Sequence, residues 1–495
     1  MAITKVVGIE TEYGIALRGA SDPNPIVASS ILINAYVSEL ARRVRWDFED
    51  ESPGNDARGF SLEGAQPPDV ETHLVNAVLT NGARYYVDHA HPEYSSPECI
   101  DALEAVRYDR AGEEILTQSM TLADASMPPG QSIVVYKNNS DRKGNSYGTH
   151  ENYLMDRSVP FANIVRHVMP HFITRQIYTG AGKVGTEAST GDREIVFQLT
   201  QRADFFEEEV GLETTLKRPI INTRDEPHSD SSKYRRLHVI VGDANMSEIA
   251  TLLKLGTTSM VLSMIEDDAF GDRDYTLAKP VHTLRQISYD TDLTLAVELA
   301  DGRKMTALEM QWELFDLARK WADDRGLEPV GEETGALILR EWERALAGLE
   351  ADPMSLADTV DWVAKYRLVE GYRDRHSLKW NDVRLAAMDL QYHDLRPEKS
   401  LVSKLGLRRL IDAADVSSAI TEPPRDTRAY FRGKCLQKWG SAIAAANWDS
   451  VVFDLGTDPL RRVPMMEPLR GTAAHVDQLL EECDTPAELL ARLGA

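Results

Sequence analysis

The first half of the chain consists of short apolar or alternating runs separated by polar loops. Alternation with a period of two is typical of strands with one buried face, and short β-rich runs bounded by Gly, Asn or charged residues also indicate strands. These patterns predict strands at Lys5–Leu17, Gly82–Asp88, Gln131–Lys137, Ile195–Leu199 and Leu237–Val241.

The second half has a different pattern, in which apolar residues recur at three- and four-residue intervals. This spacing places them on one face of an α-helix. It predicts helices at Ser247–Asp267, Ala307–Asp324, Gly335–Ala351 and Leu356–Val369. Strands with interspersed helices, followed by a helical block, favour an α+β domain over a regular βαβ repeat.

Two segments interrupt these patterns. Residues 45–70 show little apolar periodicity and many Gly, Pro, Asp and Glu residues, so we predict a long mobile loop there. A Pro-Pro pair lies within residues 421–427, and we place a domain boundary at this point. We therefore expect one large domain over residues 1–424 and a small C-terminal domain over residues 425–495.

Composition narrows the classes of function. The 495 residues include 55 Lys and Arg against 79 Asp and Glu, a net charge of −24. Because nucleic acids are bound mainly through clustered Lys and Arg, this acidity argues against DNA or RNA as a partner. Cys99, Cys435 and Cys483 are odd in number and widely spread, which supports neither a disulfide framework nor a Cys-based zinc site.

The sequence also bears on location. A signal peptide needs a continuous apolar stretch near the N-terminus, but this sequence has carboxylates at positions 10 and 12, so we expect no signal peptide. No run of roughly 18 apolar residues is evident, so we expect no membrane-spanning helix. The protein is therefore expected to be cytoplasmic.

The N-terminal segment GIETEYG, residues 8–14, carries the first candidate site. In a strand, Gly8, Glu10, Glu12 and Gly14 share one face. Two carboxylates on one sheet face suit hard cations such as Mg²⁺. An isolated Glu-x-Glu is more often a solvated strand face; the flanking glycines, which we expect to leave open space above the sheet, shift the balance toward the cation site.

A second candidate lies in the segment NGARYYVDHAHPEYSSPE, residues 81–98. As a strand it places Arg84, Tyr86 and Asp88 on one face. Arg can hold a phosphate through two hydrogen bonds, and Asp can act as base or nucleophile. His89, His91 and Glu93 follow in the next loop, and His-x-His beside Asp leaves a zinc hydrolase site as an alternative.

Three further segments carry polar or basic residues, and each has a surface-loop or core alternative. Residues 136–153 suit a loop over phosphates, with His150 and Asn152 on one strand face. Residues 221–245 hold the densest basic group, with Arg236 and His238 on one face. The C-terminal module offers Arg428, Arg432 and Trp448, which suit a purine and its phosphates. Neither a Walker A nor a Rossmann glycine pattern is present in the expected setting.

Taken together, these motifs strongly resemble one enzyme family, which contains the deamidase of Pup, also called the depupylase, and its sister, the Pup-protein ligase. The resemblance runs from residue 8 to about residue 471. It rests on GIETEYG (8–14), NGARYYVDHAHPEYSSPE (81–98), GNSYGTHENY (144–153), INTRDEPH (221–228), YRRLHVIVGDAN (234–245), TRAYFRG (427–433) and NWDSVVFD (447–454).

The resemblance implies a glutamine-synthetase-like α+β fold, in which a curved, mainly antiparallel sheet with helices holds ATP and Mg²⁺ and a small C-terminal domain contributes to the ATP site. It implies that Asp88 is catalytic. The magnesium ligands it implies are Glu10, Tyr86 and Glu93, with Glu12 as an additional candidate. The ATP contacts it implies are Arg84, Ser96, Trp448 and Arg432.

Two features favour the depupylase branch of the family. The first motif and Asp88 are far apart in sequence, with the 45–70 loop between them, whereas the ligase pattern runs quickly from one to the other. The two residues before His-Pro-Glu are His89 and Ala90, where the ligase pattern has Gly-Ser. A loop near the nucleotide could also retain ATP. The alternative is the Pup-protein ligase, which forms the isopeptide bond through a γ-glutamyl phosphate. A glutamate-cysteine-type ligase and a silent Pup-binding regulator are more distant alternatives.

The implied reaction is hydrolysis of the amide or isopeptide bond at the γ-carbonyl of the C-terminal Gln or Glu of Pup, with a functional link to the bacterial proteasome. Asp88 is expected to attack the carbonyl or to activate water. The implied partners are Pup and pupylated proteins. Pup is acidic in this family, so we predict a basic groove formed by Lys217, Arg218, Arg224, Lys233, Arg235 and Arg236.

Overall fold

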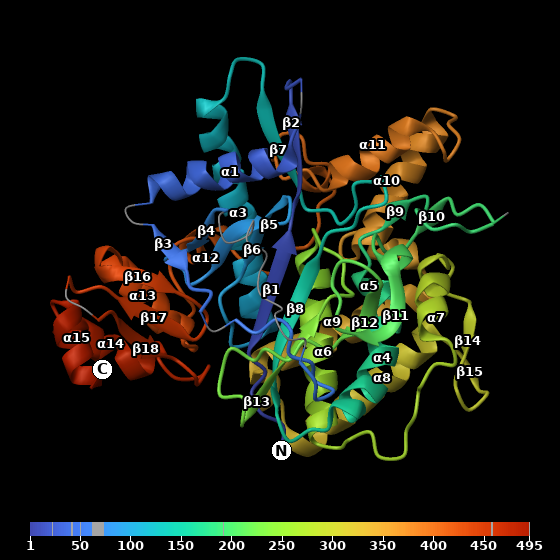
Figure 1. Ribbon diagram of the computed structural model, residues 1–495. Helices are drawn as coiled ribbons and strands as arrows, with labels where there is room; N and C mark the ends of the chain where they lie inside the picture. Colours follow the sequence, from blue (N-terminus) through green and yellow to red (C-terminus); the bar gives the residue numbers. More distant parts are fainter. Residues whose placement is uncertain are drawn as a thin grey trace.

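The computed structural model describes residues 1–21, 23–40, 43–49, 51–61, 74–191, 193–456 and 459–494. Its centre is a ten-stranded sheet in the order β13-β8-β1-β6-β5-β4-β3-β16-β17-β18, in which only the β3–β16 pair is parallel among the described strands (Figure 1). These strands are β1 (Val7–Glu12), β3 (Val44–Trp46), β4 (Asn76–Val78), β5 (Arg84–Asp88), β6 (His91–Ser95), β8 (Thr149–Asp156), β13 (Tyr234–Val239), β16 (Ile443–Ala446), β17 (Ser450–Phe453) and β18 (Arg461–Pro464).

The remaining strands form two-stranded sheets: β2 (Gly14–Arg18) with β7 (Ser132–Tyr136), β9 (Lys183–Val184) with β10 (Phe197–Gln198), β11 (Phe206–Gly211) with β12 (Arg218–Asn222), and β14 (Ala296–Glu298) with β15 (Lys304–Thr306). The helices are α1 (Pro25–Glu39), α3 (Ala102–Ser126), α4 (Phe161–Thr174), α5 (Gln176–Thr179), α6 (Glu248–Glu266), α7 (Pro280–Ser288), α8 (Ala307–Arg325), α9 (Glu332–Ala351), α10 (Asp361–Arg375), α11 (Val383–Tyr392), α12 (Ala413–Ala419), α13 (Ala429–Trp439), α14 (Ala473–Glu482) and α15 (Pro486–Leu493). The predicted α+β class with a mainly antiparallel sheet is confirmed.

Helix α6 is the central helix of the large core, and every residue from Glu248 to Ile265 is buried. The side chain of Ser247 accepts a hydrogen bond from the backbone N–H of Ala250, which caps the helix. By length and composition α6 could cross a membrane, but its apolar window is entirely buried among other elements, as in a core helix. Burial on all sides explains why apolar residues occur on every face of the helix.

The predicted helices agree with α6, α8 and α9 within a few residues. The fourth starts late, because Pro353–Leu356 form a 3₁₀ turn and α10 begins only at Asp361. Helices were expected between the strands of the first half, but no residue range was predicted for α1, α3, α4 or α5.

The predicted strand Lys5–Leu17 is divided in two. β1 stays in the central sheet, whereas β2 leaves it and pairs with β7. An added Cβ at Gly14 would lie against Oδ1 of Asn138 and the hydroxyl of Tyr147, so this glycine allows close packing, although it also borders a cavity of about 270 Å³. Gly8 borders a different cavity.

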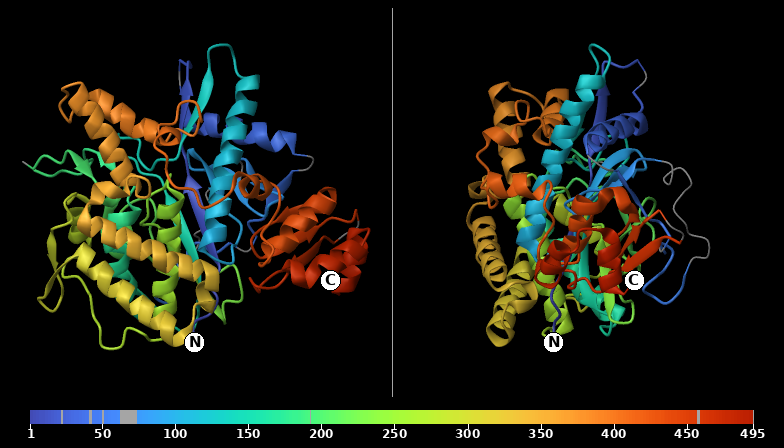
Figure 2. Two further views of the ribbon diagram at one scale, coloured as in Figure 1. Left: turned by 180° about the vertical axis from the view of Figure 1, so that it is seen from behind. Right: turned by 90° about the vertical axis from the view of Figure 1, so that its left-hand side faces the viewer.

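The C-terminal elements surround a core of their own and lie at the side of the larger body (Figure 2). That core also contains Val44, Trp46 and Val78 from β3 and β4, and β16 continues the central sheet beside β3. The boundary at residues 424 and 425 stays a prediction. Of the predicted 45–70 loop, residues 45–46 belong to β3, and residues 50 and 62–70 lie outside the described residues.

Candidate active site

The strand register brings the predicted carboxylates together on the central sheet. β1 lies between β6 and β8, so that Glu12 is paired with Glu93 on one side and Glu10 with His150 on the other. On the next strand, Tyr86 is paired with Glu93. Burial alternates along β1 and β5, with the predicted site residues at the partly exposed positions. Residues more than 70 positions apart in the sequence thus lie on the same face of the central sheet.

This face forms the floor of a cavity of about 410 Å³. Phe48, Glu51, Pro53 and Gly54, which follow β3, and residues 212–215, which follow β11, also line it. The predicted residues that line it are Glu10, Arg84, Tyr86, Asp88, Glu93 and Trp448. Glu12 is absent from this lining. One of its carboxylate oxygens accepts a hydrogen bond of 2.7 Å from the backbone N–H of Gly148.

Three carboxylates meet beside the cavity. Glu12, Asp88 and Glu93 each offer an oxygen within 4.8 Å of the others. Burial, together with the charges of Asp88 and Glu12, raises the pKa of Glu93 well above its ordinary value. Burial also acts to raise the pKa of Glu12, but hydrogen bonding and the charges of His91 and His150 outweigh it and lower that pKa to about 2. Such crowding of carboxylates fits a divalent cation, which would remove the repulsion.

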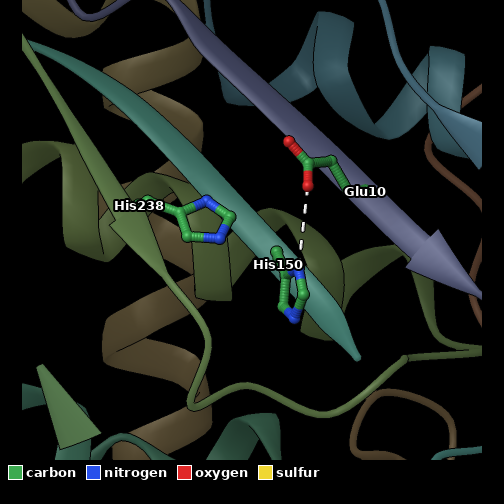
Figure 3. Close-up of side chains that lie close together, drawn as sticks. All are labelled: Glu10, His150 and His238. Carbon is green, nitrogen blue, oxygen red and sulfur yellow. Dashed lines mark ion pairs between the residues drawn. The ribbon is translucent and has the colours of Figure 1, made fainter. Parts of the chain in front are cut away.

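A second group of possible cation ligands lies on the neighbouring strands (Figure 3). Glu10 on β1, His150 on β8 and His238 on β13 offer ligand atoms within 4.8 Å of one another, and Nδ1 of His150 lies 3.6 Å from Glu10. Burial lowers the pKa of His238 well below its ordinary value, which favours the neutral imidazole. For Glu10, the two histidines and Arg236 outweigh burial and lower the pKa.

Arg84 is held between aromatic rings at the cavity edge. Its guanidinium carbon lies 4.1 Å from the ring centroid of Trp46 and 3.9 Å from that of Tyr86. Its Nε donates a hydrogen bond of 3.0 Å to Oδ1 of Asn76. Cation–π contacts and a single side-chain hydrogen bond fix this group on the cavity lining, where it can meet a phosphate.

Asp88 is the last residue of β5, and its side chain is 23% exposed. Nδ1 of His89 lies 3.1 Å from Oδ2 of Asp88, whereas Nδ1 of His91 lies 3.6 Å from Oε2 of Glu12. The two histidines therefore contact different carboxylates. This arrangement gives no support to a zinc site made from the His-x-His pair and Asp88.

Ser96 and Trp448 border a second cavity of about 80 Å³ next to the first. The hydroxyl of Ser96 accepts a hydrogen bond of 3.0 Å from the backbone N–H of Ile9 and donates one of 3.0 Å to the carbonyl of Pro97. Trp448 lines both cavities and packs edge to face with Trp46 at 5.0 Å. Trp448 therefore offers an aromatic ring to a ligand in either cavity.

Arg432 lies outside the linings of both cavities. It is fully buried, forms an ion pair with Glu98 and donates hydrogen bonds to the carbonyls of Gly82 and Trp448. Arg428 also pairs with Glu98, at 2.7 Å. Burial opposes ionisation, but the two guanidinium groups outweigh it and lower the pKa of Glu98 to about 2. These contacts connect the C-terminal elements to the sheet, and an ATP contact of Arg432 stays a prediction.

The predicted basic groove does not form one surface. Arg235 is buried on one face of β13, where it donates a hydrogen bond to the carbonyl of Val159. Arg236 is on the other face, where it lines the cavity and pairs with Glu226 at 3.6 Å. Lys233 is bound to Asp230 and Glu467 at the surface. Strand alternation separates residues that are neighbours in sequence.

The prediction also missed residues that shape the site. Trp46 and Asn76 hold Arg84, and Glu98 and Glu226 bind arginines around the two cavities. Glu98 and Glu226 lie within the motifs that carry the family resemblance. Their position as acidic residues in these motifs could have indicated them as candidate site residues. Trp46 gave no such signal, because its place depends on the pairing of β3 with strands distant in the sequence.

Comparison with known proteins gives a consistent result. The family model "Pup-ligase protein" matches residues 5–452. The chain is 54% identical to the depupylase of Acidothermus cellulolyticus and 50% identical to the Pup deamidase/depupylase of Mycobacterium tuberculosis, in each case over 99% of both chains. It is 40% identical to the Pup–protein ligase of Nakamurella multipartita, over 82% of this chain and 90% of the ligase.

Solved structures agree with this. The complex between the prokaryotic ubiquitin-like protein Pup and its ligase PafA matches with a TM-score of 0.81 and 32% identity, over 99% of this chain and 94% of that chain. PafA in complex with ADP matches with a TM-score of 0.74 and 35% identity, over 82% of this chain and 89% of that chain. The resemblance predicted from the motifs is confirmed, and the chain belongs to the Pup-ligase protein family.

Proposed function

We propose that this protein is a depupylase and Pup deamidase, which hydrolyses the amide or isopeptide bond at the γ-carbonyl of the C-terminal residue of Pup. One observation carries the proposal: the relatives that match at 49–54% identity over 99% of both chains are named depupylase or Pup deamidase/depupylase. The relatives named ligase match at 40–41% identity and over 82% of this chain. The position of Asp88 among carboxylates in a polar cavity supports it.

Residues on the sheet suit the cofactors that the family implies. Glu10, Glu12, Tyr86 and Glu93 would hold Mg²⁺, and the raised pKa of Glu93 supports a cation among them. A bound cation supplies positive charge that polarises a carbonyl and stabilises an oxyanion. Arg84, Ser96 and Trp448 border the cavities where ATP would lie, and Arg432 is a further predicted contact. The neighbour solved in complex with ADP supports nucleotide binding.

In the reaction, the carbon–nitrogen bond of the amide breaks, the amine leaves with a proton, and water supplies the hydroxyl of the new carboxylate. Asp88 either attacks the carbonyl carbon, which gives a transient anhydride, or accepts a proton from the attacking water. Arg84, Arg224 and Arg236 line the cavity, and they would orient anionic groups. A cytoplasmic location and a role in proteasomal degradation stay predictions.

The test is release of a fluorescent protein joined to Pup through a lysine isopeptide bond, followed on gels with ATP or a non-hydrolysable ATP analogue. We expect release with both nucleotides, since ATP is proposed as a cofactor that stays intact. Asp88→Asn should lower the rate by roughly 10³-fold while changing nucleotide affinity less than about twofold. Asp316→Asn, at an exposed position on α8, is the matched control and should keep full activity.

Two outcomes would contradict the proposal. Net conjugation of Pup ending in Glu, with matching ADP release, would identify a ligase instead. Full turnover in Asp88→Asn would remove Asp88 from the mechanism.

A further inference from the structure

The turn that follows Asp88 has an unusual backbone. Asp88 pairs with His91 across β5 and β6, so His89 and Ala90 form a two-residue hairpin loop. His89 has φ +49°, a conformation that few residues other than glycine adopt. Hairpin loops of this length place Gly, Asn or Asp at positive φ. A histidine at this position therefore keeps strain that a glycine would relieve.

The surroundings fix this turn in place. The hydroxyl of Ser29, a fully buried residue of α1, donates a hydrogen bond of 2.8 Å to the carbonyl of Ala90. The backbone N–H of Val87 donates one of 3.1 Å to the carbonyl of Val75. These bonds hold the backbone of the turn, and Nδ1 of His89 lies 3.1 Å from Oδ2 of Asp88.

Asp88 shares its surroundings with two other carboxylates. Glu12 and Glu93 each have a carboxylate oxygen within 4.8 Å of one on Asp88. A carboxylate in such a crowded site must be held in one rotamer if a single oxygen is to react. The imidazole of His89 is more than half exposed, so it contributes little to the packing of the core.

We infer that His89 is a positioning residue for Asp88. The N–H at Nδ1 donates to Oδ2 and holds the carboxylate in one rotamer. The other oxygen, Oδ1, is then the atom that attacks the carbonyl or accepts the proton of water. This inference rests on the proposed hydrolase function and assigns the strained turn a role within it.

The experiment compares three variants in the same release assay, with saturating ATP and Mg²⁺. His89→Gly removes the imidazole and relieves the backbone, so the melting temperature should be equal to or above that of the parent chain, whereas kcat should fall roughly 10- to 100-fold with KM changed less than about twofold. His89→Asn tolerates positive φ and keeps an N–H donor, and it should restore kcat to within about fivefold of the parent. Ala90→Gly is the control in the same turn and should keep parental kcat.

Unchanged kcat in His89→Gly would overturn the inference, and so would equal losses in His89→Gly and His89→Asn. Crystal structures of the parent and of His89→Gly give a readout that does not need activity: we expect one Asp88 rotamer in the parent and more than one in the variant. A parent chain that releases nothing would contradict the proposed function, and the rotamers of Asp88 would still decide the inference. One unchanged rotamer in both would overturn it.

Discussion

The ion pairs of Glu98 attach the C-terminal elements to the sheet, and replacing this residue should loosen that junction. Glu98→Gln leaves Arg428 and Arg432, which are 3% and 0% exposed, without a counter-charge. The pKa of Glu98 is lowered from 4.5 to about 2 in the folded state. Since one pKa unit corresponds to about 1.4 kcal/mol, the carboxylate contributes on the order of 3 kcal/mol to the free energy of unfolding. Breaking a buried ion pair costs a similar amount.

The pH dependence follows from the sign of this shift. Because the pKa is depressed by folding, the contribution is fully present above the unfolded value of 4.5 and is lost as the pH falls toward 2. The difference in stability between the parent and Glu98→Gln should therefore be constant from pH 8 to about pH 5 and should shrink below that.

The assay is urea unfolding followed by tryptophan fluorescence. Trp46 of β3 and Trp448 of the C-terminal elements pack edge to face at 5.0 Å, so separation of the two parts changes the environment of both rings. Glu422→Gln is the matched control. Glu422 forms an ion pair with Lys434, which lies on α13 as Arg432 does, but the Glu422 side chain is 49% exposed. It should cost less than about 1 kcal/mol. An equal effect of the two substitutions would refute the reasoning.

Two further predictions concern the metal and β13. Removing divalent cations with a chelator should lower the melting temperature, and Mg²⁺ at about 100 times its Kd should restore about 2.7 kcal/mol of stability. Glu93→Gln should abolish this response to Mg²⁺. A parent chain whose melting temperature does not respond to the chelator would contradict a cation at the carboxylates. Arg235→Glu should lower the free energy of unfolding by roughly 3 kcal/mol, because it places a carboxylate against the carbonyl of Val159 in a buried position. Urea unfolding measures this free energy. A stable variant with weaker Pup binding would instead support the predicted groove.

Local patterns in the sequence predicted the features that depend on local physics. The helix predicted at Ser247–Asp267 is α6, and those two residues are its caps. Alternation along β5 placed Arg84, Tyr86 and Asp88 on one face, and all three line the cavity. In both cases the spacing of side chains within one element determines the result, so the sequence alone was sufficient.

Features that depend on strand order could not be obtained in this way. The pairing of Glu12 with Glu93 requires β1 to lie beside β6, and nothing in either strand specifies that neighbour. Trp448 reaches the cavity only because β16 pairs with β3, which joins segments about 400 residues apart. The motif resemblance supplied this long-range information for the catalytic and metal candidates, but it did not indicate Trp46 or Asn76.

The predicted basic groove was inferred from the number of basic residues in one segment, without regard to the strand alternation that separates their side chains. Arg235 and Arg236 are adjacent, and counting charges assigned both to one binding surface. Within a strand, adjacent side chains point to opposite faces, so one of any such pair must lie away from a ligand on the other face. Arg235 packs 5.5 Å from the ring of Phe161, whereas Arg236 reaches Asn152 at 2.6 Å above the sheet. An acidic peptide that binds this enzyme must therefore find its positive charge on surfaces other than the buried face of β13.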